Sequence, residues 1–385
     1  MTAVAQGGAG GFSWNRVMAV LIKEFKQLTR DRLTYAMILA MPVVQLMLFG
    51  YAINTEPRHL PTALLIQEDT VFARSITAAL KNSDYFDFTA QARTPAELDG
   101  MLRRGDVQFA ITIPGDFTRR VARGDKPQIL VEADASDPSA TGGAAAALAQ
   151  LPDQALIHDL KGALAPRGEA SAPFEVVMHR RYNPEAVTAY NIVPGLLGVV
   201  LSMTLVMMTS LSVTRETERG TMESLLATPV EPLEVMVGKL APYVVVGLIQ
   251  TAVILLLAKI LFGVPMEGGW TGLTLGVSLF IVGSLALGFL ISTVARSQLQ
   301  AMQMSVFYIL PSILLSGFMF PFRGMPDWAQ AIGQVIPVTH FLRVVRGALL
   351  KGQGLGDMWR ELLALLAFVC VVSALAMARY RRTLD

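Results

Sequence analysis

The sequence predicts a polytopic α-helical membrane protein with six transmembrane helices. An extracytoplasmic α/β domain is inserted after the first of them, and an amphipathic N-terminal elbow helix precedes it. The 385 residues have a mean hydropathy of +0.48, with 53% hydrophobic and only 16% charged residues, which is too apolar for a soluble protein of this length. Apolar runs reach the roughly 20 residues that a bilayer core requires. A long stretch between the first two runs alternates strand-like and helix-like patterns.

Charge, cysteine and histidine content exclude several classes of function. The formal net charge of +2 does not indicate a nucleic-acid partner. The single cysteine, Cys370, lies in an apolar run and excludes an intrachain disulfide framework. The four histidines are scattered without the spacing of metal ligands. We therefore expect no metal site and no cofactor held by this chain.

Residues 1–32 are predicted to form the elbow helix on the cytoplasmic face. Apolar residues recur at helical spacing within residues 14–28, and basic residues fall on the opposite side. A helix of this kind lies in the membrane interface rather than across it. The next apolar run, residues 33–53, is too long for the core of a signal peptide and is predicted as the first transmembrane helix.

Residues 54–188 are predicted to form the extracytoplasmic α/β domain. Thr94 and Glu97 have the spacing of a capping box and mark the start of one helix. The low-complexity stretch at 142–147 indicates either the start of a helix or a flexible hinge. The predicted strands cover residues 63–66, 86–88, 108–113 and 128–132, and further helices cover residues 71–80 and 141–160, before a linker with Pro and Gly at 163–173.

Residues 189–385 contain the other five predicted transmembrane helices. They are expected at residues 191–213, 241–262, 273–294, 301–320 and 362–377. Lys and Arg in short loops are retained on the cytoplasmic side. Basic residues flank the first span, the loop after the second and the end of the last, whereas the loop at 263–272 has none. This bias predicts that both termini are cytoplasmic.

The outer segment, residues 321–351, resembles neither a span nor an ordinary loop. Its apolar run is interrupted by Pro326 and Pro337, so each part is too short to cross a bilayer and too apolar for water. Short re-entrant or interfacial helices on the outer side satisfy both constraints.

The most specific stretch is RETERGTMESLLATPV, residues 215–230, within a predicted cytoplasmic loop at 214–238. Gly220 permits a sharp chain reversal. Thr221 can cap a short helix whose first turn places Glu223 near the positive end of the helix dipole. Alternating Arg and Glu residues before it form a charged lip that suits a complementary partner. On residue types alone, the favoured interpretation is a solvated connector stabilised by its own ion pairs.

This string resembles the cytoplasmic loop of the ABC-2 type transporter permease family. KEFKQLTRDR in the N-terminal helix, and LSGFMFPFRGMPDW and VIPVTHFLRVVRGALL in the outer part, are similar to that family too. The resemblance covers nearly the whole chain, and the large domain after the first span resembles the drug-efflux branch of Gram-negative bacteria. It implies a multi-pass permease subunit of an ATP-driven exporter in the bacterial inner membrane.

The resemblance also implies partners. A separate ATP-binding-cassette ATPase would bind ATP and Mg, and a second permease copy or a paralogue would complete a dimer. A periplasmic membrane-fusion protein stays open as a third partner, and membrane lipids surround the spans. The residues that would couple the loop to the ATPase are Arg215, Glu216, Glu218, Arg219, Gly220, Thr221, Glu223 and Leu225.

ATP hydrolysis is not expected in this chain. Gly238 and Lys239 are adjacent, but Leu233 and Leu240 occupy the positions where GxxxxGK[ST] needs a glycine and a hydroxyl. The predicted spans have no acidic residue at mid-depth, which argues against ion-coupled transport. The alternative is a non-transport membrane protein that transmits ATPase motion to a periplasmic partner.

The outer segment is the predicted substrate exit. Broken backbone at membrane depth is tolerated only where it is buried in protein or borders a cavity. Trp328 and Phe341 would offer apolar surface to a hydrophobic or amphipathic cargo, drug-like or lipid-like, while His340 and Arg343 would keep the exit hydrated. A passive interfacial plug is the alternative interpretation.

Overall fold

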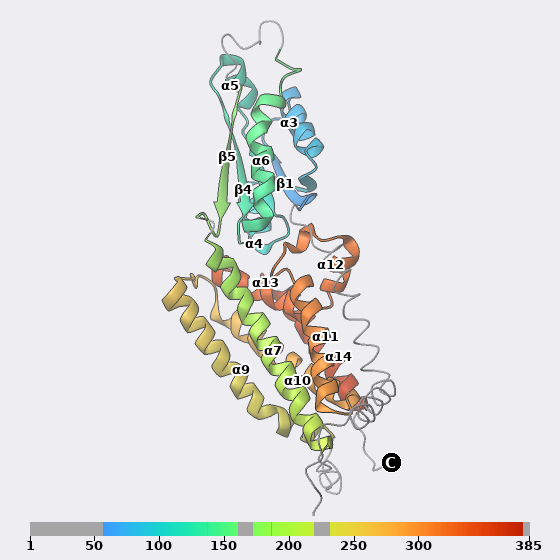
Figure 1. Ribbon diagram of the computed structural model, residues 1–385. Coiled ribbons are helices and arrows are strands. Elements are labelled where there is room, and N and C mark those ends of the chain that lie inside the picture. Colours follow the sequence, from blue (N-terminus) through green and yellow to red (C-terminus); the bar gives the residue numbers. More distant parts are fainter. Residues whose placement is uncertain (1–56, 137, 161–171, 186, 219–231, 380–385) are drawn as a thin grey trace, which may run out of the picture.

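The computed structural model describes residues 57–136, 138–160, 172–185, 187–218 and 232–379. An α/β domain lies at one end of a bundle of long helices (Figure 1). The predicted elbow helix, the predicted first span at 33–53 and residues 219–231 of the predicted loop lie outside the described residues.

The α/β domain is built on a five-stranded sheet in the order β2-β1-β3-β4-β5. Neighbouring strands are parallel except β3 and β4, which are antiparallel. β4 and β5 therefore end together, at the edge of the domain that faces the bundle (Figure 1). The strands are β1 (Leu60–Ile66), β2 (Phe86–Gln91), β3 (Phe109–Ile113), β4 (Gln128–Asp134) and β5 (Glu175–Arg181).

Helices cover both faces of this sheet. Three of them share one core, in which Phe86 and Phe109 pack edge to face with ring centroids 5.2 Å apart. A fourth helix packs on the opposite face, over Ala63 and Ala110. The first three are α3 (Val71–Asn82), α5 (Phe117–Arg123) and α6 (Pro138–Gln154), and the fourth is α4 (Pro95–Arg104).

The ends of α4 follow from its sequence. The Thr94 hydroxyl accepts from the Glu97 amide at 3.2 Å, and the Glu97 carboxylate accepts in return from the Arg93 amide at 2.9 Å. This is a capping box in which the residue before the cap supplies the second donor. At the other end Gly105 has φ +75°, the left-handed conformation that terminates helices.

Several elements of this domain differ from the sequence prediction. β5 and α5 were not predicted, and α6 ends at Gln154 rather than at residue 160. β5 is an edge strand whose sequence, EVVMHRR, lacks clear alternation, and α5 is only seven residues long. Residues 142–147 lie inside α6, which favours the helix over the hinge.

Five described helices are long and apolar enough to cross a membrane, so the chain is a polytopic helical membrane protein. They correspond to the last five predicted spans. α11 ends earlier than predicted, at Leu315 instead of residue 320, because Gly317 adopts φ +81° and Pro321 follows. The five are α7 (Thr188–Glu218), α9 (Pro232–Phe262), α10 (Trp270–Val294), α11 (Gln298–Leu315) and α14 (Trp359–Arg379).

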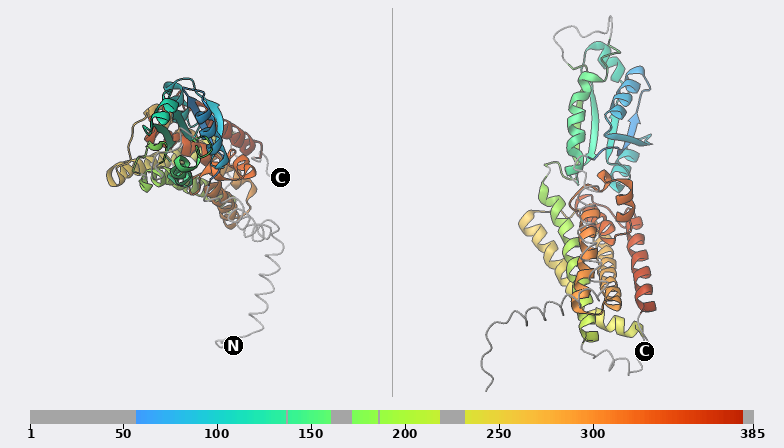
Figure 2. Two further views of the ribbon diagram at one scale, coloured as in Figure 1. Left: turned by 90° about the horizontal axis from the view of Figure 1, so that it is seen from above. Right: turned by 45° about the vertical axis from the view of Figure 1, so that its right-hand side comes forward.

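The outer segment forms three short helices. These are η3 (Phe322–Gly324), α12 (Asp327–Gly333) and α13 (Pro337–Leu350). Pro326 immediately precedes α12 and Pro337 begins α13, positions where a missing N–H costs no helical hydrogen bond. α12 and α13 lie at the end of the bundle nearest the α/β domain (Figures 1 and 2).

α10 packs against α7, α9, α13 and α14. Glycines allow these close approaches: a Cβ added at Gly276 would lie 2.6 Å from Val344 of α13, and one at Gly288 would lie 2.7 Å from the Val206 carbonyl oxygen of α7. α7 is also joined to α11 by a hydrogen bond of 2.9 Å between the Ser210 and Ser305 hydroxyls. Small residues at close helix contacts are typical of membrane bundles.

Candidate functional site

The end of the bundle opposite the α/β domain carries a polar cluster at the C-terminus of α7. The Glu218 carboxylate accepts from the Gln298 backbone amide at 2.7 Å and from its side-chain amide at 2.6 Å. Arg215 donates to the Gln298 side-chain oxygen at 3.1 Å. The last turn of α7, which contains the first residues of the predicted coupling loop at 214–238, is thereby fixed to the first turn of α11.

The environment of Glu218 favours its charged form. The side-chain hydrogen bond from Gln298, followed by the one from its backbone amide, lowers the pKa of the Glu218 carboxyl. Gln298 is the first residue of α11, so the carboxylate also lies at the positive end of that helix dipole. Glu218 is exposed and Glu216 is half-buried.

The start of α11 is a local structure that the sequence analysis missed. The Ser297 hydroxyl accepts from the Gln300 amide at 3.2 Å, and the Gln300 side-chain oxygen accepts from the Arg296 amide at 2.6 Å. The signal was present, because Ser297 and Gln300 have capping-box spacing before an apolar run. Of the other predicted coupling residues, Arg219, Gly220, Thr221, Glu223 and Leu225 lie outside the described residues.

At the other end of the bundle, His340 of the outer segment is enclosed by hydrogen-bond partners. Its Nδ1 contacts the Glu361 carboxylate of α14, and its Nε2 lies 2.8 Å from the Gln334 carbonyl oxygen. Only 8% of His340 is exposed. Sequence reasoning placed this imidazole in an aqueous exit, whereas the structure uses it to join α13 to α14.

Arg343 belongs to the same cluster. Its guanidinium lies 3.2 Å from Glu361 and 3.4 Å from the Gln334 side-chain oxygen, and 4.7 Å from the centre of the Phe322 ring. The Glu361 carboxylate at the start of α14 therefore contacts both the His340 imidazole and the Arg343 guanidinium, and it joins the outer segment to the bundle. The sequence offered no signal for Glu361 as the partner.

The two aromatic residues predicted at the exit lie in different surroundings. Phe341 is fully buried, and its ring stacks on Phe280 of α10 with centroids 4.1 Å apart. Trp328 is 44% exposed on α12. His340 and Arg343 are therefore brought together by the structure, while Phe341 and Trp328 do not share a lining with them.

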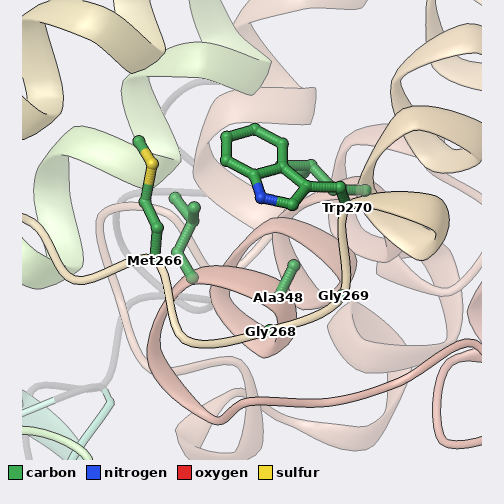
Figure 3. Close-up of a pocket in the computed structure, with 7 residues that line it drawn as sticks. Met266, Gly268, Gly269, Trp270 and Ala348 are labelled. Carbon is green, nitrogen blue, oxygen red and sulfur yellow. The ribbon is translucent and has the colours of Figure 1, made fainter.

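A small apolar pocket lies between α13 and the loop before α10. It is lined by residues that include Met266, Trp270 and Ala348 (Figure 3). The loop is attached to α13 through its backbone, with the Gly268 amide donating to the Ala348 carbonyl oxygen at 2.8 Å. The cavity volume is about 10 Å³, about what one water molecule needs and far below the roughly 300 Å³ at which drug-sized ligand sites begin.

The described residues include no group of three or more His, Cys, Asp or Glu side chains that could hold a metal ion. Charged residues of the five described spans lie near their ends rather than at mid-depth. The described part of the chain is thus an apolar helix bundle with polar clusters at both ends, next to an α/β domain.

Comparison with known proteins gives the family. Residues 32–378 match the family described as ABC-2 family transporter protein. The chain belongs to this family, which confirms the resemblance seen in the sequence. Membership makes it a multi-pass inner-membrane permease of an ABC exporter, and the family implies an ATPase as its partner subunit.

Three relatives from Escherichia coli show the extent of the similarity. The probable multidrug ABC transporter permease YbhS is 30% identical over 97% of this chain and 98% of its own length. The probable multidrug ABC transporter permease YbhR is 24% identical over 96% and 99%. The inner membrane transport permease YhhJ is 31% identical over 76% and 77%.

Proposed function

We propose that the chain exports hydrophobic or amphipathic cargo, drug-like or lipid-like, from the cytoplasm or the inner leaflet, driven by a separate ATPase. The observation that carries the proposal is the similarity along 97% of the chain to a permease named for multidrug transport. Both termini and the end of α7 that bears Glu218 are cytoplasmic, and the α/β domain is periplasmic. ATP and Mg bind to the ATPase, and this chain holds no cofactor.

The cluster of Glu218, Gln298 and Arg215 supports a coupling role for loop 214–238. α7 has 31 residues and is therefore about 46 Å long, against about 30 Å of hydrocarbon. Its last turn protrudes from the membrane, and the bonds to Gln298 fix the point where the loop begins. A displacement of this loop by the ATPase would reach α7 and α11 together.

The polar groups within the bundle suit an amphipathic cargo. The side-chain oxygens of Gln250 in α9 and Gln303 in α11 are buried without a hydrogen-bond partner among the described residues. Gln250 donates through its amide nitrogen to Thr204 of α7 at 3.3 Å. Such oxygens can accept hydrogen bonds from a polar headgroup while the surrounding helices contact an apolar body.

The exit would open at the outer segment. Because Phe341 is enclosed against Phe280, cargo reaches it only when α13 separates from α10. Trp270, Trp328 and Trp359 are all exposed, by 59%, 44% and 54%, and all lie near the same end of the bundle. Exposed tryptophans at one level are typical of a membrane interface, so Trp328 is positioned to contact lipid beside the exit.

Two further partners belong to this proposal. A second copy or a paralogue completes the permease. α9 and α14 have exposed apolar faces, which another helix bundle could cover in place of lipid. The periplasmic α/β domain provides a surface for a membrane-fusion protein where export continues across a second membrane.

The proposal is tested by reversing two charges of the loop. The chain, purified from its native membrane with the ATPase that accompanies it, is placed in liposomes with ethidium and an NBD-labelled phospholipid as cargo probes. Glu218→Lys combined with Glu223→Lys should abolish ATP-dependent movement of either probe. Position 218 loses the carboxylate that accepts from Gln298, and the loop loses two negative charges and gains two positive ones.

The matched control reverses two exposed acids of the α/β domain, Asp87→Lys with Asp125→Lys, and should leave transport intact. Normal export by the loop variant would contradict the coupling role. If the wild-type complex hydrolyses ATP but moves neither probe, the permease instead transmits ATPase motion to a periplasmic partner.

A further inference from the structure

The α/β domain and the outer segment meet at a junction that no function described above uses. Three side chains from the bundle side make part-buried hydrogen bonds to the domain there: Arg323 of η3, Lys351 at the end of α13, and Gln353 in the loop before α14. Their partners are two backbone carbonyls and one carboxylate. Two ion pairs that are more exposed also cross the junction, Arg103 with Asp357 and Arg360 with Asp106. The two parts of the molecule are stacked end to end at this point (Figure 2).

Two of these contacts cap helix α4. Arg323 donates to the Gly105 carbonyl oxygen at 2.5 Å, and Gln353 donates to the Arg103 carbonyl oxygen. The last carbonyls of a helix lack partners within the helix and carry its negative dipole end. Side chains from the membrane part therefore cap the C-terminus of α4. In an independent domain, these carbonyl oxygens would be hydrogen-bonded to water.

The third contact is a buried ion pair. The Lys351 ammonium donates to the Asp134 carboxylate, and their side chains are only 11% and 6% exposed. The other carboxylate oxygen accepts from the Ser136 amide at 3.1 Å, so Asp134 is fixed on both sides. A buried charge is tolerated only with its partner in place.

Strand topology brings a third group to this pair. Because β4 and β5 are parallel and end together, Tyr182 directly after β5 lies beside Asp134. The Lys351 ammonium is 5.6 Å from the centre of the Tyr182 ring, within reach of a cation–π interaction. Burial, followed by the charges of Asp134 and Asp99, raises the pKa of the Tyr182 hydroxyl, so the ring beside Lys351 stays neutral.

We propose that Asp134 and Lys351 are positioning residues that, together with the two α4 caps, hold the α/β domain on α13 so that the domain and the outer segment move as one body. The attachment of the α/β domain to the outer segment is inferred from the contacts at the junction alone. Its part in the transport cycle rests on the proposed export function. Opening of the outer segment would then displace the whole periplasmic domain.

A distance measurement tests the docking without any transport. Spin labels at Lys81→Cys in the domain and Leu355→Cys beside α14, both exposed positions, are introduced in a Cys370→Ser background in lipid nanodiscs. The wild-type pair should give one narrow distance distribution. Asp134→Asn combined with Lys351→Met should broaden it, and because this double variant leaves no unpaired buried charge, it should still fold.

The controls separate the pair from general loosening. Arg74→Gln breaks an exposed ion pair with Asp69 in the same domain and should leave the distribution narrow. Each single variant leaves one buried charge unpaired and should broaden the distribution at least as much as the double variant does. A narrow distribution in the double variant, or additive broadening by the singles, overturns the proposal.

Transport provides the second readout. In liposomes with the ATPase, the double variant should keep its ATP hydrolysis and move about tenfold less probe per ATP hydrolysed, an effect within the range of coupling residues. An unchanged ratio would overturn the role in the cycle. A wild-type complex that moves no probe would count against the export function, while the distance measurement still decides the docking.

Discussion

α9 and α10 are both apolar enough to cross a membrane, yet they occupy opposite environments. α9 is the more apolar of the two, but only 17% of its span is buried in the protein, against 61% for α10. The residues that distinguish them are small ones. Four glycines of α10 lie against other parts of the bundle, at Gly272, Gly276, Gly283 and Gly288.

The difference shows that hydropathy identifies a span but does not say what surrounds it. Lipid tails are as apolar as leucine, so helices in a membrane associate through close packing and hydrogen bonds rather than through hydrophobicity. Other helices can pack around α10 because its glycines let them approach closely. α9 instead displays large side chains such as Ile249 and Leu256, each 58% exposed.

The largest loss of stability is expected for Phe280→Ala in α10. Phe280 is 1% exposed and stacks on Phe341, so its removal should lower stability by about 3–5 kcal/mol. Reversible unfolding of the purified protein in mixed micelles measures the change. Leu275→Ala, on the same helix but 44% exposed, is the control, and equal losses for the two variants would show that α10 is not the centre of the bundle.

A smaller loss is expected for Gly288→Ala. The new Cβ would lie 2.7 Å from the Val206 carbonyl oxygen, so α7 and α10 must move apart, at about 1–3 kcal/mol. The same substitution at Gly142 in α6 meets no atom within 4 Å and should be neutral or stabilising. If Gly288→Ala unfolds in the same conditions as wild type, close glycine packing is not what buries α10.

On α9, Ile249→Ala and Leu256→Ala should change the free energy of unfolding by no more than about 0.5 kcal/mol, because both side chains lie on the surface. The informative measurement is the oligomeric state in nanodiscs. Loss of a dimer in these variants would show that a second copy covers this face. An unchanged assembly together with a large loss of stability would contradict the exposure of α9.

The smallest effect is expected where α7 leaves the bundle. Hydrogen bonds from Gln298 lower the pKa of Glu218 in the folded protein, so their stabilisation is complete above the unfolded value of about 4.3 and is lost as pH falls through the lower folded value. Melting temperatures of wild type and Glu218→Gln should differ near neutral pH and converge in acid. A difference in melting temperature that grows on acidification would contradict the lowered pKa of Glu218.

The sequence located the five described spans because bilayer length and hydropathy are local properties. The predicted spans at 241–262 and 273–294 end at the same residues as α9 and α10. It also placed the start of α4, since Thr94 and Glu97 act within one turn. The end of α11 was misplaced because the run stays apolar beyond Gly317, whose backbone conformation ends the helix.

The candidate sites were less accessible to sequence reasoning because their partners are distant in the chain. Glu218 meets Gln298, and Asp134 meets Lys351, across 80 and 217 positions. His340 contacts Glu361, 21 positions away in the chain, and no sequence pattern indicated this pair. Phe341 is an aromatic residue of the kind that binds apolar cargo. Its burial against Phe280 depends on how α13 and α10 cross, which the sequence does not show.

The short connection between β5 and α7 has a consequence for how the protein is made. Only residues 182–187 separate Arg181, the last residue of β5, from Thr188, the first of α7, and Asn183 is fully buried with both ends of its amide bonded to Val187. β5 can therefore join the sheet only when α7 is close to its final place in the bilayer. During biosynthesis, completion of the sheet and membrane insertion of α7 become a single step, and a delay in insertion leaves β4 as an open edge.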